Sequence, residues 1–103
     1  MIEAIHGAGV AMAKLALDAA ALRHHAIAHN LANLQSEGYV PLGVRFDGKR
    51  SELVRESTQG FAPSLDAEMV KLAQNTLHYQ ALVRAIGKQH AILGAAIAEG
   101  RRA

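Results

Sequence analysis

The sequence predicts an all-α fold in which two long antiparallel helices form a coiled-coil-like hairpin. An irregular connector with at most a short β-ribbon joins them. Two observations predict this fold: apolar residues recur at spacings of three and four over two long segments, and turn-forming residues gather between those segments. The 103 residues suffice for a single domain. We expect the first helix over 1–34, the connector over 35–63 and the second helix over 64–100.

The N-terminal segment carries its apolar residues at alternating steps of three and four, the rhythm of a coiled-coil seam. The predicted helix-packing seam of this segment consists of Ile5, Ala8, Met12, Leu15, Ala19, Leu22 and Ala26. Gly7 and Gly9 fall in its first turns, and a glycine in a helix interior costs up to about 1 kcal/mol relative to alanine. We therefore expect the N-terminus to fray in the isolated chain.

The C-terminal segment keeps the same alternation of three- and four-residue steps without interruption. Its predicted seam consists of Leu65, Met69, Leu72, Thr76, Tyr79, Val83, Ile86, His90, Leu93 and Ile97. Ser64 is expected to be the N-cap, and Asp66 and Glu68 place negative charge in the first turn, where the helix dipole favours it. Gly100 is expected to end the helix.

Both helices also carry apolar residues away from the seams, among them Ile27, Leu77 and Ile92. A lone hairpin leaves such positions in water, and small lone domains are marginally stable. We therefore expect other copies or other proteins to cover them. Thr76 and His90 are polar at seam positions, which fits two interpretations: they fix register or oligomeric state, or they are tolerated at a partly wet interface.

Charge and cysteine content exclude several classes of protein. The formal charge is only +2 and the basic residues are scattered, so a nucleic-acid binder is not indicated. The absence of cysteine excludes disulfides, thiol catalysis and cysteine-based metal sites. The N-terminus lacks the basic start of a signal peptide, and Lys14 and Asp18 interrupt its apolar stretch. We therefore expect no membrane-spanning segment and no cleaved signal.

No pattern of residues indicates catalysis. His25 and His29 are four apart, a spacing that can hold zinc between two imidazoles. A zincin-type site also needs a glutamate beside the first histidine and further ligands, which this stretch lacks. The sequence therefore predicts no enzymatic activity, no metal and no cofactor. A metal-dependent enzyme using His25 and His29 is the alternative that this pair leaves open.

The end of the first helix carries a specific motif, "NLANLQSEGY". It resembles the N-terminal signature of the bacterial flagellar rod, hook and hook–filament axial proteins, a segment close to N-[IL]-A-N-x-x-T-P-G-Y. The matching residues are Asn30, Leu31, Ala32, Asn33, Gly38 and Tyr39. Ser36 and Glu37 replace the usual Thr-Pro, so the turn before the glycine is less rigid than in the family pattern.

The C-terminal half narrows this resemblance. Its pieces "DAEMVKLAQNTLHYQAL" and "AAIAEG" are similar to the closing helix of proximal rod proteins of the FlgB type, and "VRFD" lies where that family has its post-turn segment. The connector is short for the family. The resemblance implies a non-enzymatic subunit of the flagellar basal-body rod, exported by the type III apparatus without a cleaved signal. It also implies partners: further copies of the chain, other rod proteins and export-gate components.

The resemblance suggests roles for the motif residues. Asn30 and Asn33 are expected to end the helix by bonding freed backbone groups, while Gly38 allows the positive φ of a tight turn; alternatively, the two asparagines bond a neighbouring subunit. Tyr39 is expected to pack on the hairpin or on a neighbour. Two other interpretations stay open: a helical binding module for an export component or chaperone, and a shortened relative that no longer serves motility.

Overall fold

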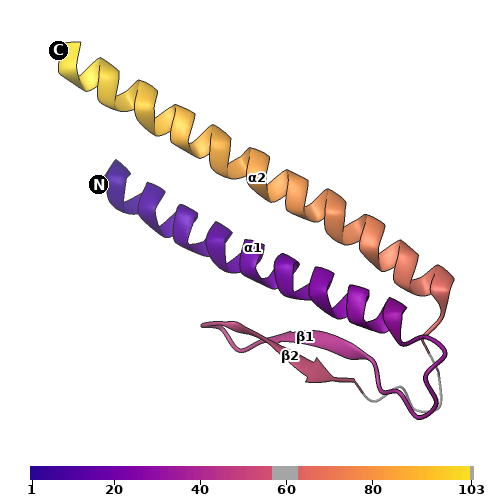
Figure 1. The fold of residues 1–103 in the computed structure, drawn as a ribbon. Coiled ribbons are helices and arrows are strands. Elements are labelled where there is room, and N and C mark those ends of the chain that lie inside the picture. The colour runs from indigo at the N-terminus through magenta and orange to yellow at the C-terminus, as the bar shows by residue number, and fades with distance from the viewer. Residues whose placement is uncertain (57–62, 103) are drawn as a thin grey trace.

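The computed structural model describes residues 1–56 and 63–102 and contains two long helices and a two-stranded ribbon. In chain order these are α1 (Ile2–Ala32), β1 (Leu42–Phe46), β2 (Ser51–Arg55) and α2 (Leu65–Arg102). The helices run antiparallel, with both chain termini at the same end (Figure 1). The predicted helical hairpin with a short ribbon in its connector is thus confirmed. Residues 57–62 of the predicted connector, and Ala103, lie outside the described residues.

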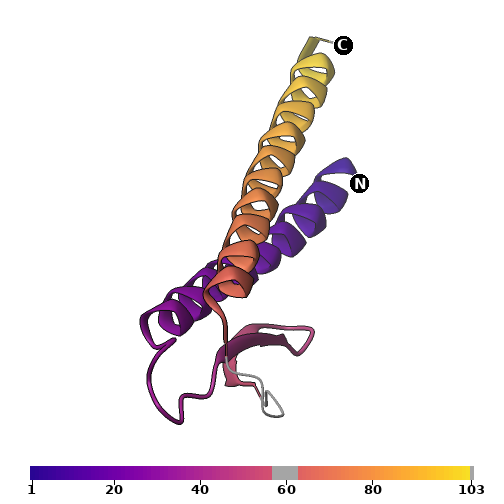
Figure 2. The same ribbon diagram turned by 90° about the vertical axis from the view of Figure 1, so that its right-hand side faces the viewer.

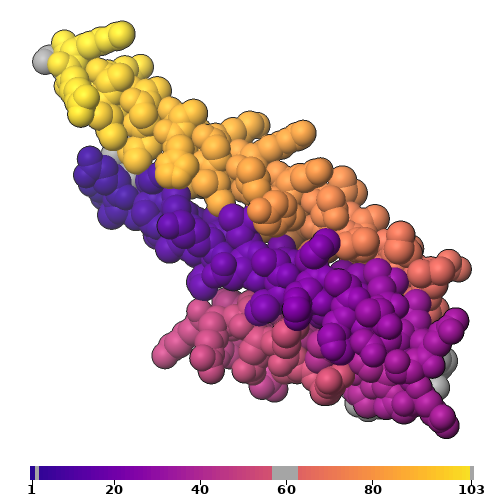
Figure 3. All heavy atoms as spheres, viewed as in Figure 1, coloured from indigo at the N-terminus to yellow at the C-terminus, as the bar shows by residue number. Residues whose placement is uncertain are grey.

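Helix α1 is the middle layer of the molecule. Helix α2 packs on one side of it and the ribbon on another (Figures 1 and 3). The ribbon lies against the second half of α1 and stops short of its first turns. Figure 2 shows that the two helices cross at an angle. The result is a rod-like molecule of 67 × 24 × 16 Å in which α1 presents two different faces to the rest of the chain.

The ribbon is a tight antiparallel hairpin in which Val44 lies opposite Leu53. Asp47 organises its turn, since one carboxylate oxygen accepts hydrogen bonds from the backbone N–H groups of Lys49 and Arg50, each at 2.9 Å. The bonds from Arg50 and then Lys49 hold the pKa of Asp47 below its usual value. The exposed turn is therefore fixed by local hydrogen bonds.

The boundaries of α2 follow the predicted cap but not the predicted stop. The Ser64 hydroxyl accepts a hydrogen bond from the Ala67 N–H at 3.1 Å, which confirms Ser64 as the N-cap. The helix continues through Gly100 to Arg102, so the prediction that Gly100 ends it is wrong. A glycine in the last turn destabilises a helix little. The positive charges of Arg101 and Arg102 interact favourably with the negative, C-terminal end of the helix dipole.

The core is small and partly polar. Among residues 1–56 and 63–102, the buried apolar side chains are Ala19, Ala20, Ala26 and Ile27 in α1 and Pro41 just before β1. The buried polar side chains are Asn30, Glu68 and Asn75. Two of these, Asn30 and Glu68, are the largest side chains with under 2% exposure. Hydrogen bonding therefore contributes much of what holds the two helices together.

The stripe of α1 that faces α2 is displaced by one residue from the predicted seam. Residues of α1 that lie against α2 include His6, Gly9, Ala20, Arg23 and Asn30. The first four each follow a predicted seam residue directly, and one residue turns a helix by about 100°. Of the predicted seam, Ala19 and Ala26 are buried and Leu15 and Leu22 half-buried, whereas Ile5 and Met12 are 67% and 72% exposed.

Small residues lie where α2 comes close to α1. The contacting stripe contains Gly9 and Ala20, whose small size lets α2 approach closely. The predicted seam, with Met12 and Leu22, lies on the adjacent face. Ribbon contacts cover part of that face, and its N-terminal part extends beyond the ribbon. Both stripes contain small and large residues, so an apolar pattern alone does not select the stripe that packs on α2.

In α2 the predicted seam is correct at three of its ten positions. Leu72, Ile86 and Leu93 are half-buried, as a seam requires. Elsewhere the interior side chains come one residue before a predicted position, with Glu68 and Asn75 buried and Leu82 half-buried. The predicted seam residues that are exposed in this chain are Leu65, Met69, Thr76, Tyr79, Val83, His90 and Ile97. At Glu68 and Asn75 the interior side chain is polar, and a search for apolar residues does not select it.

The segment Glu3–Ala32 of α1 is long and apolar enough to cross a membrane by length and composition alone. Lys14 and Asp18 therefore do not exclude such a segment by this criterion, and the expectation that the chain has none stays a prediction. Core helices of soluble proteins meet the same criterion. In the structure the second half of α1 packs against α2 and the ribbon.

Candidate functional site

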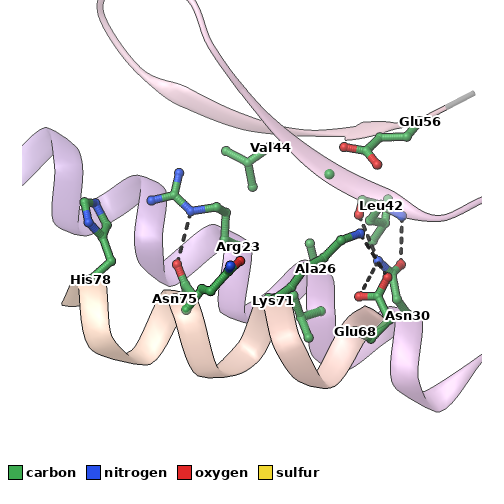
Figure 4. Close-up of a pocket in the computed structure, with 13 residues that line it drawn as sticks. Arg23, Ala26, Asn30, Leu42, Val44, Glu56, Glu68, Lys71, Asn75 and His78 are labelled. Atoms are coloured by element: carbon green, nitrogen blue, oxygen red, sulfur yellow. Dashed lines mark hydrogen bonds and ion pairs between the residues drawn. The ribbon is translucent and has the colours of Figure 1, made fainter. Parts of the chain in front are cut away.

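Asn30 joins three elements at the end of α1, and it is 1% exposed. Its amide nitrogen donates to the Leu42 carbonyl at 3.0 Å and to Glu68 Oε2 at 3.4 Å. Its amide oxygen accepts from the Leu42 N–H at 2.8 Å and from the Tyr39 hydroxyl at 2.6 Å. One buried side chain thus ties α1 to the start of β1 and to the first turns of α2, with every polar atom bonded (Figure 4).

These contacts determine the direction of each hydrogen bond. The Leu42 N–H can only donate and its carbonyl can only accept, so the Asn30 amide has one possible orientation. The Tyr39 hydroxyl must then donate to the Asn30 oxygen. Nδ1 of His29, 2.7 Å from the same hydroxyl, therefore carries a proton and donates to it. His29 also stacks on Tyr39, with ring centroids 5.6 Å apart.

Asn33 and Gly38 form the turn that leads away from α1. The Asn33 amide nitrogen donates to the His29 carbonyl at 2.9 Å, one of the carbonyls left free at the helix end. The Ser36 hydroxyl donates to the Asn33 amide oxygen at 3.2 Å, and Gly38 has φ +72°. Asn33 and Gly38 thus act as expected, whereas Asn30 bonds the ribbon and α2 instead of the helix end. Within the motif, Leu31 is half-buried and Ala32 is exposed.

A second polar contact joins the helices farther along. The Asn75 amide nitrogen donates to the Ala20 carbonyl at 2.8 Å, and its oxygen accepts from Arg23 Nε at 3.1 Å. Glu68, which is 1% exposed, also accepts from Lys71 Nζ at 3.2 Å. Buried carboxylates and amides are costly unless they are bonded. Asn30, Glu68 and Asn75 therefore set the register in which α2 lies on α1.

A groove of about 450 Å³ lies between α1, α2 and β1 (Figure 4). Its lining includes both acidic and basic side chains: Arg23, Glu56, Glu68, Lys71 and His78. Their opposite charges leave no strong field of one sign to select an ion. The groove also shares the buried polar side chains of the helix junction. Its arrangement fits a packing interface and contains no nucleophile beside a general base.

The roles of Glu68 and Asn75 are not predicted from the sequence. Glu68 is expected only as a helix-start acid, and the structure buries it against Asn30. Asn75 was not singled out, although it lies in a helix interior, where asparagine is a poor helix former. That unfavourable placement is the signal that could have indicated a structural amide.

The histidines predicted as a possible zinc pair take separate roles. His29 is bonded to Tyr39, whereas His25 is exposed. Within residues 1–56 and 63–102, no three or more His, Cys, Asp or Glu residues gather closely enough to share a metal ion. His25 and His29 thus have no third ligand nearby in the described part of the chain.

Comparison with known proteins does not assign a function. No protein-family model matches the sequence, and no curated protein is significantly similar to it. The sequence motif and the geometry of its residues are therefore the features that point to a function.

Proposed function

We propose that the protein is a structural subunit of the bacterial flagellar basal-body rod, of the proximal rod type. In this proposal the chain is exported without a cleaved signal and assembles through its two helices with further copies, other rod proteins and the export-gate end of the basal body. Inter-subunit helix packing then carries torque along the drive shaft and surrounds the export channel. No catalytic step, metal or cofactor is part of this role.

The observation that carries the proposal is the bonding of the axial-type motif. Asn30 and Tyr39, at the two ends of "NLANLQSEGY", bond each other, and Asn30 also bonds both the ribbon and α2. The nine-residue separation of Asn30 and Tyr39 thus lets their side chains bond each other while Asn30 ties the end of α1 to β1 and α2. A subunit that transmits torque needs such a rigid junction, since slack between its helices would absorb the applied twist.

The exposed apolar side chains support an assembling protein. Large apolar residues on both helices face solvent in the single chain, including Ile5, Met12, Leu77, Val83 and Ile92. The apolar residues buried within residues 1–56 and 63–102 are mostly alanine. Burial of apolar surface stabilises by about 25 cal/mol per Å², so neighbouring subunits would add the stabilisation that this small core does not supply.

The proposal is tested by searching for the protein in purified hook–basal bodies by mass spectrometry. The tryptic peptide Leu72–Arg84 lies within α2 and is suitable for quantification. We expect a few copies per particle, in constant ratio to other rod proteins. Complete basal bodies that lack this peptide would contradict the proposal.

The second candidate is a helical binding module that docks onto a secretion or export component. The closed hydrogen-bond network around Asn30 favours it, because a module must hold its shape before it meets its partner. The two candidates differ in the isolated chain. A module would be folded over its whole length as a monomer and unfold in one concentration-independent transition, whereas a rod subunit would be folded around the Asn30 junction but partly unfolded at its free helix ends until it assembles.

A further inference from the structure

Two histidines from different helices face each other near the open end of the hairpin. The imidazole centroids of His6 in α1 and His90 in α2 are 5.1 Å apart, with the ring planes at 64°. His6 is half-buried and His90 is exposed, so the pair is accessible from solvent. Neither residue has a hydrogen bond recorded to its side chain among the described residues, in contrast to His29, whose ring is bonded to Tyr39.

This separation agrees with two imidazoles sharing one tetrahedral zinc ion. Zinc lies about 2.0–2.1 Å from a ligating imidazole nitrogen, which places the ion roughly 3.2 Å from each ring centroid. Two such rings at the tetrahedral angle have centroids about 5.2 Å apart. The χ2 torsion of histidine is broad and soft, so each ring can turn to present a nitrogen to an ion between the two rings.

Solvent supplies the rest of the coordination sphere. His90 is exposed and His6 is half-buried, so water reaches an ion held between the two rings. The hollow of about 210 Å³ beside His6 is lined also by Ile5, Gln89, Ile92 and Leu93, so its wall is largely apolar and the waters come from the open side of the pair. With only two protein ligands such a site is open and exchangeable, unlike the closed four-ligand sites of zinc fingers.

We propose that His6 and His90 form a binding site for zinc or a similar imidazole-preferring divalent cation, which fastens the open end of α1 to α2. This proposal is independent of the rod assignment. The ion would cross-link the part of the hairpin farthest from the buried Asn30 junction, where Ile5 and Ile92 are largely exposed. Because the two ligands come from different helices, only the packed hairpin can bind with both, so zinc stabilises the folded state.

The test is calorimetric titration and thermal unfolding of the full chain with Zn²⁺, with Mg²⁺ as the control cation. Wild-type protein should bind Zn²⁺ and gain about 5–10 °C in Tm when zinc is about ten-fold above its Kd. Mg²⁺ prefers oxygen ligands and should have no effect. His90→Gln should lower the zinc affinity by about ten-fold or more and abolish the Tm gain.

His25→Gln is the matched control, because His25 is exposed and belongs to the alternative pair with His29. It should keep the zinc affinity and the Tm gain of the wild type. The proposal is overturned if wild-type protein shows no zinc-dependent Tm gain, or if His90→Gln retains that gain. It is likewise overturned if His25→Gln alone removes it, since zinc would then sit between His25 and His29.

Discussion

Asn30 shows how one buried amide can join a junction of three elements. Its amide nitrogen donates to Leu42 and Glu68, and its oxygen accepts from Leu42 and Tyr39. Asn30→Asp keeps the shape but removes both donated bonds and places a carboxylate beside the Glu68 carboxylate. We expect a loss of about 3–5 kcal/mol in the free energy of unfolding, measured by urea denaturation followed by circular dichroism.

Asn33→Asp is the control for this prediction. It makes the same chemical change at a residue that has no bond to a buried acid. Asn33 loses one donated bond, to the His29 carbonyl. It also adds negative charge at a helix C-terminus, so we expect a loss of about 1–2 kcal/mol. Equal losses for the two variants would show that Asn30 has no special role at the junction.

Substitution of Gly38 tests the conformation of the turn in the motif. Gly38 adopts φ +72°, and a Cβ added there meets no atom within 4 Å, so the cost of Gly38→Ala is one of backbone conformation alone. We expect a loss of about 1–2 kcal/mol in unfolding free energy. Gly87→Ala is the matched substitution in a helix interior, also with open space around the added Cβ, and should stabilise by about 0.5–1 kcal/mol. If chemical denaturation shows that both variants change the free energy of unfolding in the same direction, this account is contradicted.

Between elements, α2 approaches α1 closely at Ala20, a small residue of the stripe that contacts α2. Ala20 is 1% exposed and its carbonyl accepts from Asn75, so Ala20→Leu should force the helices apart and weaken that bond. We expect a loss of about 1–3 kcal/mol in unfolding free energy. Ala21→Leu, one residue away on an exposed position, should change it by less than about 0.5 kcal/mol. Unchanged stability of Ala20→Leu would place α2 on the stripe that the sequence predicts.

The sequence predicts the elements well and their mutual register poorly. Periodicity, the Ser64 cap and Gly38 are local signals, and each agrees with the structure. The contact between His6 and His90 depends on how far one helix slides along the other, which no local pattern specifies. The burial of Glu68 was likewise missed, because a lone acid near a helix start ordinarily faces solvent.

At the scale of the whole molecule, the chain is a rod with a polar junction at one end and uncovered apolar faces. The ribbon covers only part of α1 (Figure 3). Ile5 and Met12 of α1 are 67% and 72% exposed. A single chain leaves these side chains in water, so we expect a neighbouring subunit to cover them in the assembled rod. Substitution at Met12 should thus affect assembly more than the stability of the chain itself.

The most direct test of the rod assignment is the reactivity of a single thiol at this position. The chain has no cysteine, so Met12→Cys introduces one unique site for a maleimide label. We expect rapid labelling in the isolated protein and strong protection in purified basal bodies that contain the variant. If the variant in complete basal bodies is labelled as fast as in the isolated chain, or if the wild-type protein is absent from complete basal bodies, the assignment to a packed rod subunit is wrong.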